Sequence, residues 1–231
     1  GLSLTRWRQL YREGAARSLA LLAAPEALGP ETMAGLSGAF RRVLRVDMDI
    51  DLRFDTLAAI MSILVLGVGA LVLFYCADYF HHHDGHTEKR LPSFAAEMVA
   101  FSGAMFGLVT SDNMLVLYVF WELTSVLSFL LVGHYAERAT SRRAATQALM
   151  VTTLGGLAML VGIVILGHYS GTYLLSELVA KATEHGLADT AINVALVLVL
   201  IGALSKSAIV PMHFWLPGAM AAPTPVSAYL H

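Results

Sequence analysis

The sequence predicts an all-α fold, a bundle of helices that crosses a membrane several times. Of its 231 residues, 57% are hydrophobic and only 14% are charged, with a mean hydropathy of +0.66, whereas a soluble domain carries about a quarter charged residues. Apolar runs long enough to cross a hydrocarbon core, about 20 helical residues, recur after position 55. Because the backbone must satisfy its own hydrogen bonds in lipid, these runs are expected to be helices.

Charge and cysteine content exclude several classes of protein. The net charge of -2 excludes the basic footprint of a nucleic-acid-binding protein. The single cysteine, Cys76, excludes an internal disulfide, a multi-cysteine metal site and an iron–sulfur cluster. No secretory signal peptide is visible. The chain does not begin with Met, and it stops at His231 inside a new apolar segment, so we expect a fragment of a longer protein.

Residues 1–55 form a polar flank that differs from the rest of the chain. They hold eight of the fifteen Lys and Arg residues and seven of the seventeen acids. The apolar stretch at 15–29 is too short to cross a bilayer. We expect one or two amphipathic helices here, followed by a membrane domain over 56–231.

The first three expected spans follow one another closely. The first, about 56–79, begins with a long run that has no charged residue. The second, about 92–111, has one charged residue, Glu97, near its beginning. The third, about 113–135, has one charged residue, Glu122, near its centre. A carboxylate at that depth is costly, so a specific role for Glu122 is expected.

Two further spans and the start of a sixth complete the domain. The fourth, about 144–168, has no charge, and the turn-like GHYSGT at 167–172 marks its end. The fifth, about 190–210, has one charge, Lys206. Four prolines then fall within fifteen residues, after which apolar residues resume at about 222–231.

Loop charges predict the orientation of these spans. The connections after the second and fourth spans hold a single basic residue, Lys181, whereas those after the first and third hold five: Lys89, Arg90, Arg138, Arg142 and Arg143. The first and third connections are therefore expected in the cytoplasm. The arginine-rich flank would then lie outside, against the same rule, unless further spans precede it, it is not native sequence, or the orientation is reversed.

Glu122 and Lys206 are the two charges placed deep in expected spans. Each costs about 2.5–3.5 kcal/mol at a helix centre on insertion scales. One interpretation is a structural ion pair that fixes two helices in register. The other is a titratable pair on an ion or proton path, which is the default for such residues.

The prolines after Lys206 predict a broken helix. Proline removes a backbone hydrogen bond and hinders the turn before it, so we expect an interruption between Lys206 and Pro217, with Pro211 at its centre. Broken helices at membrane depth occur where protein or a water-filled cavity surrounds them, and they mark ion sites in transporters. The alternative is a plain helix end near the interface, anchored by His213 and Trp215.

Two sets of histidines are candidate sites. His231, about two turns into the last helix, is either a packed histidine or, if it lies near the buried lysine, a member of a proton relay. The cluster of His81–His83 with Asp84 and His86 has metal-ligating residue types. A solvated loop is favoured there, because adjacent histidines point in different directions, so no metal site is assigned.

Three runs carry a resemblance to a known family: WELTSVLSFLLVGHY at 121–135, GALSKSAIVPMHFWLPGAMAAPTPVSAYLH at 202–231, and MDIDLRFDTLAAIM at 48–61. Together they resemble the A subunit of Mrp-type multisubunit sodium(cation)/proton antiporters, which is similar to the proton-pumping antiporter-like subunits of respiratory complex I. The resemblance covers about 47–231. It implies a partial antiporter-like fold with a discontinuous helix. The chain would hold the helix before the first of two inverted five-helix repeats, four helices of that repeat, and the beginning of its fifth.

The resemblance also implies roles and partners. Glu122, Lys206 on the discontinuous helix, and His231 match the family's residues of a proton half-channel. The parent would be an ion transporter subunit rather than an enzyme, without a cofactor, in the bacterial inner membrane. Its partners would be other subunits of an antiporter complex, the lipid bilayer, protons and monovalent cations. The alternatives are a proton-pumping subunit of a complex I-like oxidoreductase or membrane hydrogenase, and a non-conducting structural membrane module.

Overall fold

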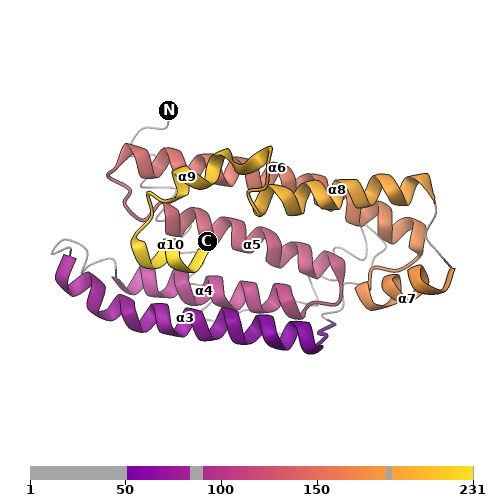
Figure 1. Ribbon diagram of the computed structural model, residues 1–231, viewed down its shortest axis with the longest axis horizontal. Coiled ribbons are helices and arrows are strands. Elements are labelled where there is room, and N and C mark those ends of the chain that lie inside the picture. The colour runs from indigo at the N-terminus through magenta and orange to yellow at the C-terminus, as the bar shows by residue number, and fades with distance from the viewer. Residues whose placement is uncertain (1–50, 84–90, 186–188, 231) are drawn as a thin grey trace, which may run out of the picture.

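A computed structural model describes residues 51–83, 91–185 and 189–230. Within these residues the fold is a bundle of α-helices (Figure 1). Five long or apolar helices form the bundle: α3 (Thr56–His83), α4 (Leu91–Thr110), α5 (Met114–Val132), α6 (Ala139–Ser170) and α8 (Thr190–Lys206). Four short elements complete it: α7 (Leu175–His185), the 3-10 helix η2 (Met212–Trp215), α9 (Leu216–Ala219) and α10 (Thr224–Leu230).

The helices pack in the order in which they occur along the chain. α3 packs on α4, α4 on α5, and α5 on α6. α8 and α9 both pack along α6, and they lie almost end to end in Figure 1. α10 turns back into the bundle, where it contacts α3 and α5. The last helix described is thereby brought against α3, the first helix of the domain.

Four helices are long and apolar enough to cross a membrane by length and composition: α3 over Thr56–Cys76, α4 over Pro92–Thr110, α5 and α6. Their outward faces remain apolar, as Leu71 and Phe74 of α3 illustrate with 71% and 84% exposure. Such faces suit lipid or other membrane helices. The fold is thus a polytopic membrane bundle, as the composition predicts.

Glycines allow α6 and α8 to approach closely. A Cβ atom added to Gly162 would lie 2.6 Å from the Ala195 carbonyl oxygen, and one added to Gly202 would lie 2.8 Å from the Gly155 carbonyl oxygen. Small residues serve this purpose widely in membrane helices. The antiparallel register that results places the C-terminal end of α8 beside Gly155, halfway along the 32 residues of α6.

α8 is shorter than the expected span at 190–210. It has 17 residues and ends at Lys206, so it rises only about 25 Å. Ala208 then has a φ of 50°, a left-handed conformation that does not continue an α-helix. η2 and α9 follow this residue, and the Trp215 indole N–H donates to the Ser205 carbonyl at 3.0 Å. The fifth helix is therefore discontinuous.

Other boundaries differ from the expected spans by a few residues. α6 begins at Ala139 rather than near 144, so its first turns include Arg142 and Arg143. A membrane helix tolerates arginines there, because their long side chains reach the polar boundary of the bilayer. Its end is marked by Gly171, with a φ of 70°, inside the predicted turn at 167–172. The segment after that turn includes the surface helix α7.

Candidate functional site

Lys206 is placed near the middle of the bundle by the early end of α8. It is the last helical residue. On one side it lies at the level of the midpoint of α6, since its neighbour Ser205 contacts Gly155. On the other side its side chain reaches the middle turn of α5. The break in the fifth helix therefore presents an amine at mid-depth rather than at a membrane surface.

The Lys206 ammonium is fully hydrogen-bonded by α5. Its Nζ donates to the Trp121 carbonyl oxygen at 2.7 Å, to Thr124 Oγ1, and to Ser125 Oγ at 3.0 Å. It also lies 4.6 Å from the centroid of the Trp121 ring, within the range of a cation–π interaction. An ammonium has three N–H donors, so all three are satisfied by oxygen atoms without formal charge.

Glu122 occupies an adjacent face of the same turn of α5. Its carboxylate is directed toward α6, where a Cβ atom added to Gly156 would overlap Oε1. The carboxylate interacts with the phenol of Tyr118, one turn earlier. Oε1 itself has no hydrogen-bond partner among the described residues. A half-buried carboxylate with an unused acceptor can receive a proton or a donor group.

The two charges interact without forming a contact ion pair. Lys206 and Glu122 lie close enough for an electrostatic interaction. In the described ranges, ion pairs join Arg53 to Asp55 at 3.3 Å and to Asp112 at 4.0 Å, and none joins Glu122 to Lys206. The glutamate therefore faces α6 while the lysine is bound one helix face away.

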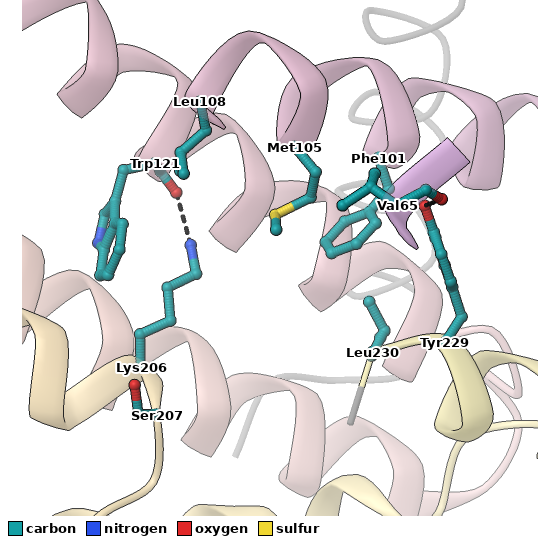
Figure 2. A pocket seen from close by; sticks show the side chains of 9 residues that line it. All are labelled: Val65, Phe101, Met105, Leu108, Trp121, Lys206, Ser207, Tyr229 and Leu230. Carbon is teal, nitrogen blue, oxygen red and sulfur yellow. Dashed lines mark hydrogen bonds between the residues drawn. The ribbon is translucent and has the colours of Figure 1, made fainter. Parts of the chain in front are cut away.

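A cavity of about 280 Å³ extends from Lys206 through the bundle. Figure 2 shows its wall: Leu108, Met105 and Phe101 of α4 lie in sequence between the lysine and Tyr229 of α10. At the far end, the Tyr229 hydroxyl donates to the Val65 carbonyl at 2.9 Å and shares a hydrogen bond of 2.7 Å with Ser102. The cavity thus has polar groups at its two ends and an apolar middle.

The structure brings two of the three candidate pathway residues into one region. Glu122 and Lys206 meet at the middle of α5, whereas His231 lies outside the described residues. Leu230, which precedes it in the chain, lines the cavity. Of the helix-break residues, Pro211 lies between α8 and η2, and Pro217 is the second residue of α9.

The histidine cluster lies mostly outside the described residues. His81–His83 end α3, but nothing is described of their side chains, and 84–90 are not described at all. Among the residues that are described, no group of three or more histidine, cysteine or acidic side chains is arranged to hold a metal ion.

The oxygen atoms that bind Lys206 were missed by reasoning from the sequence. Thr124 and Ser125 are 0% and 1% exposed and lie one turn after Trp121. A signal for them exists, because two adjacent hydroxyl residues beside a membrane-buried glutamate are costly in an apolar run. The same signal does not say which element they face, since Lys206 is more than 80 residues away in the chain.

Comparison with protein families decides the class of the chain. Residues 111–231 match the family described as "NADH:quinone oxidoreductase/Mrp antiporter, TM". The chain belongs to this family. Residues 42–89 match a second one, described as "NADH-Ubiquinone oxidoreductase (complex I), chain 5 N-terminus". The match to the NADH:quinone oxidoreductase/Mrp antiporter family therefore includes the break, both buried charges and the part of the cavity wall that follows residue 111.

Individual relatives of this family are antiporter subunits. Over 192 residues the chain is 46% identical to a probable K(+)/H(+) antiporter subunit of Rhizobium meliloti (strain 1021), covering 82% of the chain and 18% of the relative. Over 186 residues it is 42% identical to an Na(+)/H(+) antiporter subunit of Staphylococcus haemolyticus (strain JCSC1435), covering 80% and 22%. The chain thus spans about a fifth of the length of these relatives.

A solved structure supports the same assignment at the level of the fold. The whole chain superposes on part of a chain in the "Structure of Mrp complex from Dietzia sp. DQ12-45-1b", with a TM-score of 0.68 and 31% sequence identity. It covers 26% of that chain. The partial antiporter-like bundle expected from the resemblance is confirmed, including its discontinuous helix.

Proposed function

We propose that this chain is part of a membrane subunit of a cation/proton antiporter, and that Glu122 and Lys206 belong to a proton half-channel within it. The observation that carries the proposal is the position of Lys206. A helix that ends at mid-depth presents the amine to the cavity lined by α4 and α10, one helix face from a carboxylate with an unused acceptor. Titratable groups at that depth are costly and mark ion paths.

Proton movement would use the two groups in turn. When Glu122 is ionised, its charge attracts the Lys206 ammonium; when it is protonated, that attraction is lost and the α5 oxygens hold the ammonium. His231 is the proposed next member of the path, since the preceding residue, Leu230, lines the cavity. The path would continue in parts of the longer protein.

The proposed partners are those of the relatives. The similar proteins are named as antiporter subunits, and the structural match is to an Mrp complex. We therefore propose that the parent assembles with other membrane subunits in a bacterial inner membrane. The relatives' names include both K(+) and Na(+), so we propose that the exchanged ion is a monovalent cation.

A double-mutant cycle tests the half-channel. In the full-length complex, Glu122→Gln and Lys206→Ala are each expected to lower cation-dependent proton movement in inverted vesicles while leaving assembly intact. Because the two charges are coupled, the double variant should lose less than the sum of the single losses. Wild-type transport in Glu122→Gln, or strictly additive losses, would reduce the pair to a structural role.

The second candidate is a proton-pumping subunit of a complex I-like oxidoreductase. It is favoured by the match of 42–89 to complex I chain 5. Co-purification separates the two proposals. Small hydrophobic subunits alone would support the antiporter, whereas flavin and iron–sulfur proteins in the same complex would support the oxidoreductase.

A further inference from the structure

The oxygen atoms that hold Lys206 form a complete binding set on one turn of α5. Thr124 Oγ1 and Ser125 Oγ donate their own protons to the Trp121 carbonyl, at 2.7 and 3.2 Å. Each hydroxyl then has its lone pairs available to accept from the ammonium. All three acceptors are used by Lys206.

This set competes with Glu122 for the ammonium. The carboxylate lies against Gly156 of α6, on another face of α5. An ammonium whose three donors are occupied can bond to the carboxylate only by giving up at least one of them. The strength of the hydroxyl contacts therefore controls how readily Lys206 leaves one position for the other.

We infer that Thr124 and Ser125 are positioning residues that hold Lys206 in a resting position away from Glu122, and so separate the two charges during the transport cycle. This inference rests on the proposed proton path and adds two residues to it. Both side chains are buried, at 0% and 1% exposure, so water cannot easily take their place as hydrogen-bond acceptors for the ammonium. The other charged or titratable groups described around Lys206 are Glu122 and Tyr118 on α5 and Tyr229 on α10, whereas α3 and α4 contribute apolar cavity walls.

The test removes the hydroxyls without changing side-chain volume greatly. In the full-length complex, Thr124→Val with Ser125→Ala is expected to lower the rate of cation-dependent proton movement at least about tenfold, since the loss of even one hydrogen bond to a charged group has about that effect. The pH profile of transport should also shift, because the ammonium now lies closer to Glu122. Thr124→Ser keeps a hydroxyl and should retain both the rate and the profile.

Thr152→Val is the matched control. Thr152 is a buried threonine on α6 whose hydroxyl donates to the Ala148 carbonyl at 2.9 Å, and it is not among the oxygen atoms that accept from the Lys206 ammonium. Its variant should keep wild-type rate and pH profile. Equal losses in Thr124→Val and Thr124→Ser, or in Thr152→Val, would overturn the inference, because the loss would then not depend on a hydroxyl facing the lysine. The single variants Thr124→Val and Ser125→Ala provide the same comparison if the double variant fails to assemble.

A structural measurement completes the test. In a structure of the Thr124→Val, Ser125→Ala complex, the Lys206 ammonium is expected to leave the Trp121 carbonyl and lie within about 4 Å of the Glu122 carboxylate. An ammonium that stays at Trp121 would overturn the inference. If Glu122→Gln and Lys206→Ala abolish transport while the hydroxyl variants behave as wild type, this inference fails and the half-channel stands. If Glu122→Gln transports normally, the half-channel itself fails.

Discussion

The Glu122 carboxylate is seated against Gly156 of the neighbouring helix, in a space that a single methyl group would fill. The adjacent glycine has a different function, because a Cβ atom on Gly155 would instead meet the Ser205 side chain of α8. One glycine therefore accommodates the buried acid, and the next accommodates the broken helix. Substitutions at these two positions should have separable effects.

Gly156→Ala is expected to lower transport at least about tenfold while the complex still assembles. The added methyl group would displace the Glu122 carboxylate, and misplacement of a reacting group by about 1 Å is costly. The measurement is cation-dependent proton movement in vesicles, with complex assembly judged by co-purification. Gly103→Ala is the control, because its Cβ would have nothing within 4 Å. A fully active Gly156→Ala would mean that the carboxylate position is not critical.

Tyr229→Phe is expected to loosen α10 from α3 and α4. It removes the bonds to the Val65 carbonyl and to Ser102, each worth about 1 kcal/mol. Hydrogen–deuterium exchange over 224–230 should become faster, with little change in α5. Tyr75→Phe serves for comparison, because Tyr75 is 53% exposed. Equal exchange in the two variants would show that the Tyr229 hydroxyl does not hold α10.

Asp112→Ala is expected to release α7. The Asp112 carboxylate accepts from the Ser176 amide at 3.0 Å and from the Ser176 hydroxyl at 2.5 Å, so it caps the first turn of that helix. Loss of such a cap costs about 0.5–2 kcal/mol. Trypsin should then cleave sooner at Lys181, which is exposed on α7. Asp51→Ala, an exposed residue of the same end of the bundle, should leave cleavage unchanged.

Opposite ends of α6 are expected to label from opposite sides of the membrane. The charge bias of the loops places Glu137, before α6, in the cytoplasm and Glu177, on α7, outside. Both are exposed. In a Cys76→Ala background, Glu177→Cys should react with an impermeant maleimide in intact cells, and Glu137→Cys only after the membrane is opened. The reverse pattern would show that the orientation is inverted.

Helix positions were largely predictable, and their ends were less so. The first residues of α3 and α8, Thr56 and Thr190, agree with the expected spans, because each follows a charged residue, Asp55 or Asp189, that accepts a bond from the first turn. The end of α8 at Lys206 could not be located to the residue. It depends on the left-handed Ala208, and alanine carries no signal for that conformation.

The two charges of the candidate site could be picked out from the sequence, whereas their contacts could not. Glu122 and Lys206 were identified because isolated charges in apolar runs are costly. Their separation onto two faces of α5 depends on how α6 and α8 pack. That packing joins residues far apart in the chain, and neither periodicity nor loop charge reports it. The same packing is also what brings Lys206 to the hydroxyls of Thr124 and Ser125.

The early end of α8 has a final electrostatic consequence. Aligned peptide dipoles give the C-terminal end of a helix about half a negative charge, and Lys206 is the last residue of α8. The break thus supplies the ammonium with a counter-charge that belongs to the backbone and cannot be protonated. Glu122 supplies a second one that can. In the proposed proton path, protonation of Glu122 would remove only one of these two negative charges, and the ammonium would keep the stabilisation that comes from the helix end.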